Sequence, residues 1–302
     1  MIMVVCMDIT NQETASQNTQ MPELTVTSEI YEEYDYKTKI SPSTEGNVIS
    51  EFPFLLPKAG SSATYDDDDD LDIERPQKEV IRIEHSSKTK IALVGLQVWR
   101  GAFLLGDWLI HLGLKGELTN RSVLELGAGT GLTSFVAALY AKKVICTDIN
   151  MGGILDLIKL NAKYNKKLVK SQFKVMPLDF TDTAWSPALL TEIKQASIII
   201  AADVIYDDDL TAAFVSTIQK ILNTEPPKTL YMVLEKRYVF TIEHLDSVAP
   251  CYETFLTLLD KVKTENAHST WNIQQLPLDF PKYFTYDRVK DLVLWKISSI
   301  PN

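Results

Sequence analysis

The chain has few of the residues that build disulfide frameworks and metal centres. Its 302 residues include three cysteines, Cys6, Cys146 and Cys251, and no two of them form a Cys-x-x-Cys pair. The four histidines are scattered along the chain without the spacing of metal ligands. An odd number of cysteines with this spacing predicts neither a disulfide framework nor a zinc site, and it is typical of a reducing compartment. We therefore expect an intracellular protein without a bound metal.

Long apolar runs and an excess of positive charge are also missing. No run of 18 or more apolar residues occurs, which predicts no membrane-spanning helix, and the short apolar start lacks the basic flank of a signal peptide. The net charge of −10 is uneven, because residues 1–85 hold 18 acids and 6 bases whereas residues 86–302 hold 22 acids and 24 bases. Nucleic-acid surfaces need clustered Lys and Arg. We therefore expect neither a membrane nor a nucleic acid as a direct partner.

The first quarter of the chain lacks sustained hydrophobic periodicity. Residues 1–79 are rich in Thr, Ser, Glu, Asp and Pro, and they include five consecutive carboxylates at Asp66–Asp70. Adjacent carboxylates repel one another and cannot share a core. We expect residues 1–79 to form a disordered acidic tail, a solvated linker more than an interaction arm, and residues 80–302 to form the folded domain.

From residue 80 onward, short apolar strands alternate with segments of helical periodicity. Strands are predicted at 80–83, 91–94, 122–126, 143–147, 172–176, 197–202, 229–234, 271–276 and 292–297, and helices at 101–112, 131–141, 153–164, 187–193, 209–222 and 252–262. Repeated βα units predict an α/β fold, a doubly wound Rossmann-like sheet with helices on both faces. The last two strands follow each other without a helix, which predicts an antiparallel edge.

A glycine-rich turn follows the strand at 122–126. Gly127, Gly129 and Gly131 stand between this strand and a helix, where glycine permits a positive φ and lets a ligand approach the backbone. Dinucleotide sites space their glycines G-x-G-x-x-G around a pyrophosphate, whereas the spacing here is G-x-G-x-G. Glu125 would repel a pyrophosphate but suits the cationic methionine end of S-adenosylmethionine. The turn therefore favours S-adenosylmethionine over a nicotinamide dinucleotide.

A second acid stands at the end of the next strand. Asp148 lies 21 residues after Gly127. A carboxylate at the tip of this strand can accept hydrogen bonds from both ribose hydroxyls of a nucleotide-like cofactor. The alternative is an Asp that caps the following helix, and the glycine turn upstream favours the ribose role.

Four stretches together resemble the family 16 protein lysine methyltransferases, a branch of the seven-strand methyltransferases. They are Val98-Trp-Arg-Gly101, Glu125–Gly131, Leu178-Asp-Phe180 and Ala202-Asp-Val-Ile-Tyr206, the last of which matches the family's Asp-x-x-Tyr element. The resemblance runs from about Val80 to the C-terminus. It implies transfer of a methyl group from S-adenosylmethionine to a lysine of another protein, in the nucleus, the cytoplasm or both. It also implies a nuclear, nucleic-acid-associated substrate, while the oligomeric state stays open with a monomer favoured.

The resemblance also implies roles for individual residues. Asp203 and Tyr206 would position the lysine amine, Asp179 and Phe180 would hold the adenine, and Asp148 would hold the ribose. Many relatives carry Trp at the position of Phe180, and the phenylalanine ring offers less area for stacking than the indole of Trp. The remaining cofactor contacts implied are Trp99, Glu125, Gly127, Ala128, Gly129 and Ala202.

Other interpretations remain open. Trp99 can simply hold the first helix to the sheet, and Phe180 can belong to the core. Asp203 can cap the loop that follows it, with Tyr206 packed beneath. Asp207–Asp209 predict a helix N-cap more than a metal site. Two other functions also remain open. The first is a methyltransferase that acts on a nucleic acid or a small molecule, although the chain lacks the Asn/Asp-Pro-Pro-Tyr motif typical of enzymes that methylate an amino group on a base. The second is a non-catalytic scaffold that only binds the cofactor.

Overall fold

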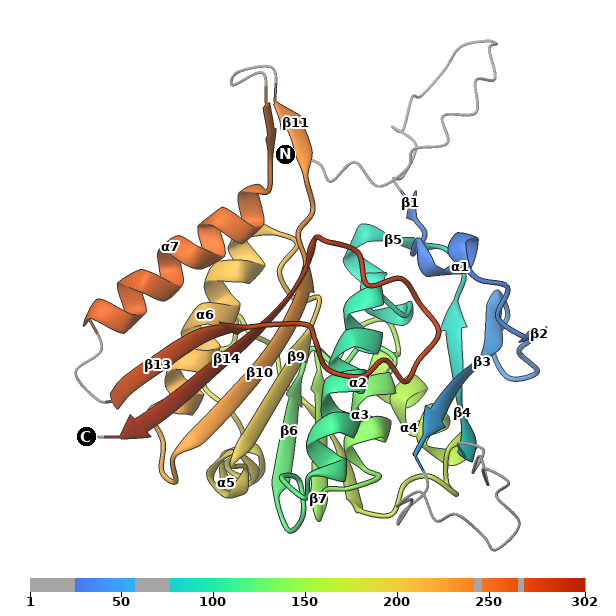
Figure 1. Ribbon diagram of the computed structural model, residues 1–302, viewed down its shortest axis with the longest axis horizontal. Helices are drawn as coiled ribbons and strands as arrows, with labels where there is room; N and C mark the ends of the chain where they lie inside the picture. Colours follow the sequence, from blue (N-terminus) through green and yellow to red (C-terminus); the bar gives the residue numbers. More distant parts are fainter. Residues whose placement is uncertain (1–24, 58–76, 242–245, 266–268, 302) are drawn as a thin grey trace, which may run out of the picture.

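A seven-stranded sheet forms the centre of the protein, whose computed structural model describes residues 25–57, 77–241, 246–265 and 269–301. The strand order is β13-β14-β10-β9-β6-β7-β8 (Figure 1). Strands β8, β7, β6, β9 and β10 are parallel to one another, whereas β14 is antiparallel to both β10 and β13. This confirms the predicted fold class and its antiparallel edge. The bounds are β6 Ser122–Leu126, β7 Lys143–Asp148, β8 Gln172–Pro177, β9 Ile198–Ala202, β10 Lys228–Glu235, β13 Ser269–Leu276 and β14 Leu292–Pro301.

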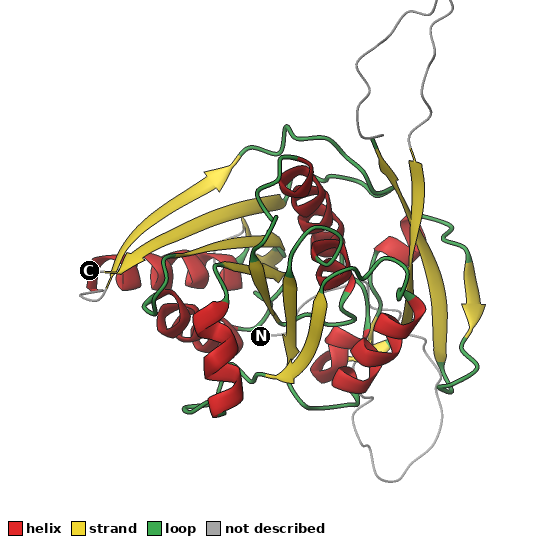
Figure 2. Ribbon diagram, turned by 90° about the horizontal axis from the view of Figure 1, so that it is seen from below, coloured by secondary structure: helices red, strands yellow, loops and turns green. Residues whose placement is uncertain are grey.

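Helices cover both faces of this sheet (Figures 1 and 2). Along the central strands, Val123 and Ile200 point into the core beneath α2 and α3, while Leu124 and Ile199 point into the core beneath α5, α6 and α7. All four side chains are buried, which is why these strands read as continuous apolar runs. The bounds are α2 Arg100–Leu114, α3 Leu132–Ala137, α4 Ile154–Tyr164, α5 Pro187–Gln195, α6 Asp208–Leu222 and α7 Pro250–Glu265.

The strand predicted at 91–94 is wrong. These residues begin a 3-10 helix, η1 (Ile91–Leu96), which follows the two-residue strand β5 (Thr89–Lys90) and leads into α2. A short apolar run cannot be assigned to a strand or a helix from periodicity alone. Here the apolar side chains line a cavity instead of pointing into a sheet core. The stretch Ile91–Leu114 is long and apolar enough to cross a membrane by composition, but 67% of its most apolar window is buried inside the fold. It is a core element of this domain.

The prediction of disorder over 1–79 is wrong for residues 25–57. They form β1 (Thr25–Val26), α1 (Ile30–Glu33), β2 (Thr38–Ile40) and β3 (Asn47–Leu56). Strand β3 pairs antiparallel with β4 (Gln77–Ser86) along its full length. Its side chains alternate there, so that Phe52 and Phe54 are buried while Pro53 between them is not. Residues 77–79 of the predicted tail begin β4, and the remainder, including Asp66–Asp70, lies outside the described residues.

The sheet β2-β3-β4 packs against the helices beside it (Figure 1). The Phe52 ring lies 5.3 Å from that of Phe103 on α2, measured between centroids. Asn161 of α4 accepts a hydrogen bond from the backbone N–H of Glu84 at 2.7 Å and donates one to its carbonyl oxygen at 3.0 Å. These contacts join the N-terminal segment to the parallel sheet, so the folded domain begins well before residue 80.

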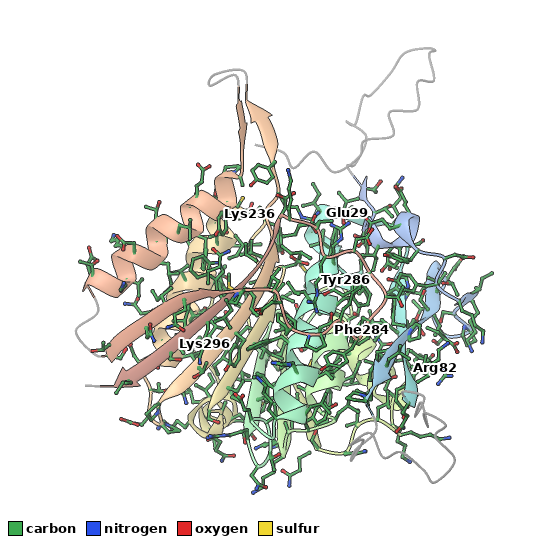
Figure 3. All side chains as sticks on the ribbon, in the orientation of Figure 1. Glu29, Arg82, Lys236, Phe284, Tyr286 and Lys296 are labelled. Atoms are coloured by element: carbon green, nitrogen blue, oxygen red, sulfur yellow. The ribbon has the colours of Figure 1, made fainter. Side chains whose placement is uncertain are left out.

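The loop between β13 and β14 is tied to α2 by one buried carboxylate. Asp107 is fully buried and accepts hydrogen bonds from the Tyr286 hydroxyl, the Arg288 guanidinium and the backbone N–H groups of Tyr283 and Phe284. Figure 3 shows Phe284 and Tyr286 on this loop, lying over α2. A hairpin of β11 (Val239–Thr241) and β12 (Asp246–Val248) projects beyond the end of β10 (Figure 1).

Candidate functional site

A cavity of about 600 Å³ lies at the carboxyl ends of β6, β7 and β9, beneath η1. Ligands of open α/β sheets bind at this edge. The structure brings every predicted site residue to this cavity, although their individual roles stay predictions. They are Trp99, Glu125, Gly127, Ala128, Gly129, Asp148, Asp179, Phe180, Ala202, Asp203 and Tyr206.

The glycine turn needs its glycines for both conformation and space. Gly127 and Gly129 have φ values of +64° and +56°, in the left-handed region. A Cβ on Gly129 would lie 3.0 Å from the carbonyl oxygen of Gly95 in η1, and one on Gly127 would lie 2.7 Å from a methyl of Val204. The turn therefore presents bare backbone to the cavity, where a ligand can lie directly against it.

Glu125 is a buried acid without a cation. Its side chain accepts hydrogen bonds from the hydroxyls of Thr133 and Ser134 in α3, and it forms no ion pair with any described residue. Burial raises the pKa of Glu125 to about 8, and the charge of Asp148 adds to the rise. A cationic group of a ligand beside this carboxyl would favour its ionised form and lower the pKa again.

Asp148 holds the glycine turn while facing the same cavity. Its Oδ2 accepts a hydrogen bond from Gly129 N at 2.7 Å, and its Oδ1 accepts one from Ile149 N at 2.7 Å. Burial raises the pKa of Asp148 to about 6, although the two backbone donors oppose the rise. A carboxylate has about four acceptor positions, so roughly two remain for ligand hydroxyls. Both interpretations of Asp148, local cap and ligand acceptor, are compatible with this geometry.

The far end of the cavity is formed by the segment after β8. Asp179 Oδ1 accepts hydrogen bonds from Thr181 N at 2.8 Å and Thr181 Oγ1 at 2.7 Å, which fixes the carboxylate. The ring of Phe180 packs edge-on against Phe214 of α6, with centroids 5.3 Å apart. The same ring lies 3.4 Å from where a Cβ of Gly127 would stand. Phe180 is thus anchored in the core and also forms the cavity wall.

Trp99 joins η1 to the cavity at the start of α2. Its indole N–H donates to the carbonyl oxygen of Val94 at 2.9 Å. The guanidinium of Arg237 lies 5.3 Å from the centre of its ring. The predicted alternatives for Trp99, a structural contact and a wall of the site, are therefore combined in one residue.

Asp203 is held by two backbone donors. Its φ is +53°, an uncommon conformation for a residue other than glycine. Oδ2 accepts a hydrogen bond from Gly101 N at 2.7 Å, and Oδ1 accepts one from Glu235 N at 2.9 Å. Burial raises the pKa of Asp203, while Arg237 and these donors lower it. The carboxylate thus joins the beginning of α2 to the end of β10, a structural role that the sequence left as the alternative.

Tyr206 faces the cavity from the same loop. No described residue forms a hydrogen bond with its hydroxyl, and burial raises its pKa to about 12, with Asp148 and Asp207 adding to the rise. Asp207 caps α6 by accepting from Leu210 N at 2.9 Å, which confirms the predicted N-cap. Among the residues that the structure covers, no group of three or more His, Cys, Asp or Glu could hold a metal ion.

A smaller cavity continues the site on the side of Asp203 and Tyr206. It shares Val94, Trp99, Asp203 and Tyr206 with the main cavity and adds Ile205, Glu235 and Arg237. Glu235 and Arg237 were not among the residues predicted for the site. Ion pairs between residues far apart in the chain leave no local signal, so their partners could not be found from the sequence.

The fold and the glycine turn define a cofactor-binding α/β domain. Residues 76–250, more than half of the chain, match the family model described as lysine methyltransferase, and the chain belongs to this family. It is 34% identical over 244 residues to methyltransferase-like protein 22 of Mus musculus and 33% identical over 239 residues to that of Homo sapiens. These matches cover 76% and 74% of this chain but 61% and 58% of the relatives, so the chain spans about three fifths of their length.

A third relative shares a shorter region. The protein N-lysine methyltransferase METTL21A of Xenopus tropicalis is 30% identical over 152 residues, which are 50% of this chain and 64% of that protein. This likeness, to a protein named for lysine methylation, agrees with the match to the family model.

Proposed function

We propose that this protein is an S-adenosylmethionine-dependent protein-lysine N-methyltransferase. Family membership supports the reaction class. The observation that carries the proposal is the pair of buried acids, Glu125 and Asp148, placed at a glycine turn without a counter-cation from the described residues. Buried carboxylates are normally paired, so this arrangement suits a ligand that brings its own positive charge.

The residues in the cavity fit the parts of S-adenosylmethionine. Glu125 would lie at the cationic methionine end and Asp148 at the ribose hydroxyls. Asp179 and Phe180 would hold the adenine, with a carboxylate for its amino group and a ring for its face. When bound, the cofactor supplies a methyl group on a positively charged sulfur. Bare backbone at Gly127 and Gly129 leaves room for the ligand beside these acids.

The lysine amine would approach the main cavity beside Asp203 and Tyr206, where the smaller cavity is about 20 Å³, room for about one water molecule. A methyl group supplied by the cofactor would be accepted by the lone pair of the lysine amine. The lysine would therefore have to release a proton to water first, since its pKa is about 10.4 in water. Surroundings with little water, such as those formed by Val94, Trp99 and Ile205, favour the neutral amine. The unpaired hydroxyl of Tyr206 can orient it, while Asp203 holds the backbone around the opening.

The finer identity of the substrate is part of the same proposal. A nuclear, nucleic-acid-associated protein is supported by the resemblance in motifs and by likeness to the curated relatives. An enzyme acting directly on a nucleic acid is disfavoured by the nearly neutral charge of residues 86–302. A scaffold without turnover is disfavoured by the intact acids Glu125, Asp148 and Asp203.

Two measurements on the full chain test the proposal. Titration calorimetry measures S-adenosylmethionine binding, with Asp148→Ala as the variant that should bind at least about tenfold more weakly, since hydrogen bonds to charged groups contribute about 1.5–3 kcal/mol each. A tritiated methyl-transfer assay then uses nuclear and cytosolic extracts of cells lacking this protein. If S-adenosylmethionine binds but no protein is labelled, the protein is a cofactor-binding scaffold. If RNA or DNA is labelled instead, the acceptor is a nucleic acid and not a lysine.

A further inference from the structure

A network of six charged side chains adjoins the acceptor end of the site, and two of them, Glu29 and Glu33, belong to the N-terminal segment. Arg100 lies at the start of α2, Glu235 ends β10, and Arg237 follows it. Arg100 Nη1 donates to Glu235 Oε1 at 2.5 Å. Glu33 pairs with Arg100 and Glu29 pairs with Arg237, both across to the N-terminal segment. Figure 3 shows Glu29 at the same end of the molecule as Lys236, the residue between Glu235 and Arg237.

We propose that Glu29 and Glu33 of the N-terminal segment give the acceptor end of the cavity a net negative charge and thereby attract a lysine in its cationic form, before it enters the drier surroundings in which it loses its proton. This inference rests on the proposed function. Without the N-terminal segment, the two arginines Arg100 and Arg237 face two acids, Asp203 and Glu235, and these four formal charges sum to zero. Glu29 and Glu33 change the sum to −2.

The charges nearest the cavity are buried, whereas the two glutamates are partly exposed. The side chain of Arg100 is 4% exposed and that of Glu235 is 12% exposed, so water screens these charges less than surface charges, while Glu29 and Glu33 are each 29% exposed. Burial raises the pKa of both Glu235 and Asp203. If the N-terminal segment were absent, protonation of either acid would leave the two arginines in excess and would repel a lysine. The segment that reverses this balance lies outside the residues matched by the family model.

Two buried carboxylate oxygens of the network lack a hydrogen-bond partner. They are Glu29 Oε2 and Glu235 Oε2, although Arg237 approaches the latter to 3.8 Å. Arg100 Nε is a buried donor of the same network that also lacks a partner. Buried polar atoms without a partner are uncommon in native proteins. Acceptors outnumber donors among these three atoms, which agrees with the negative sum of the charges.

The test uses n-butylammonium as the probe, since it has the four-carbon stem and charge of a lysine side chain. The full chain is saturated with S-adenosylhomocysteine, and the probe is titrated while the indole N–H signal of Trp99 is followed by NMR. Glu29→Gln should raise the dissociation constant of the probe about fivefold, because one nearby charge is lost. The matched control is Glu32→Gln in the same helix, an exposed glutamate that should leave the constant unchanged.

Two further titrations separate an effect of charge from an effect of the variant on folding. Butan-1-ol, a neutral probe of the same length, should bind the wild type and Glu29→Gln equally. Rising NaCl should weaken n-butylammonium binding to the wild type but not butan-1-ol binding, and this comparison does not depend on any variant. The inference is overturned if S-adenosylhomocysteine binds while Glu29→Gln and salt leave the n-butylammonium constant unchanged. Failure of S-adenosylhomocysteine to bind would instead overturn the proposed function.

Discussion

Replacement of Phe52 by alanine tests whether the N-terminal segment is an integral part of the domain. The Phe52 ring is fully buried in β3. It contacts the rings of Tyr36 and Phe103 at centroid distances of 4.8 and 5.3 Å. A buried Phe→Ala change costs about 3–5 kcal/mol, from lost apolar burial and the cavity left behind. A shift of the melting temperature on the order of 10 °C follows for a domain of this size.

Ile40→Ala is the matched control for Phe52→Ala. Ile40 lies in β2 of the same small sheet, but its side chain is 84% exposed. Its loss should leave the melting temperature within about 2 °C of the wild type, because surface substitutions change stability by about 0.5 kcal/mol or less. Thermal unfolding is followed by circular dichroism for both variants. Equal melting temperatures for Phe52→Ala and Ile40→Ala would refute the claim that β3 is part of the core.

The remaining predictions concern the site and its boundary. The pKa of Glu125 is raised from 4.5 to about 8, so between these pH values the folded chain keeps the carboxyl proton that the unfolded chain releases. The contribution of protonated Glu125 to the free energy of unfolding therefore falls as the pH rises from about 5 to 8. Glu125→Gln should flatten the pH dependence of the melting temperature, and S-adenosylmethionine should bind the wild type more tightly at pH 8 than at pH 6.5; titrations that show no such pH dependence would contradict this. Asp203→Ala should lower the melting temperature together with turnover, because it leaves two backbone N–H groups without an acceptor at about 1–3 kcal/mol each. Tyr206→Phe should lower kcat with the melting temperature unchanged, and parallel kinetics and unfolding curves separate the two effects. A chain truncated to begin at Arg75 should unfold well below the full chain, and similar melting temperatures would show that residues 25–57 add nothing to the fold.

The parallel sheet and its glycine turn could be predicted because their signals are local. Each central strand is a short apolar run, and the strand from 122 to 126 leads directly into Gly127, Gly129 and Gly131. Buried parallel strands need apolar residues on both faces, so their sequence identifies them without knowledge of their neighbours. The same locality placed Asp148 and Asp203 at strand ends beside one cavity.

Strand β3 could not be predicted because its signal is weak and its partner is distant. The alternation through Phe52 and Phe54 is short, and Pro53 lies within it, a residue that sequence patterns place at edge strands or outside strands. Its pairing partner β4 begins only at Gln77, beyond the acidic stretch that led to the prediction of disorder. Tertiary pairing thus decided the structure where the composition favoured a solvated tail.

The partners of the charged residues were equally hidden. Glu29 and Arg237 are 208 positions apart, and nothing in either neighbourhood indicates the other. For Asp203, the sequence identified a carboxylate at a strand end but not the two backbone groups that already bind it. Hydrogen-bond partners depend on the three-dimensional arrangement of several elements, so the structural role of Asp203 became apparent only in the structure.

Mass spectrometry of the methylated product tests the central claim most directly. The full chain is incubated with tritiated S-adenosylmethionine and the cell extract, and the labelled protein is digested and sequenced. The account predicts that the added methyl group lies on a lysine side chain, and that Asp148→Ala, which weakens cofactor binding, reduces the label. A label on arginine, on histidine or on a nucleotide, or a label of equal strength with Asp148→Ala at limiting cofactor, would contradict it.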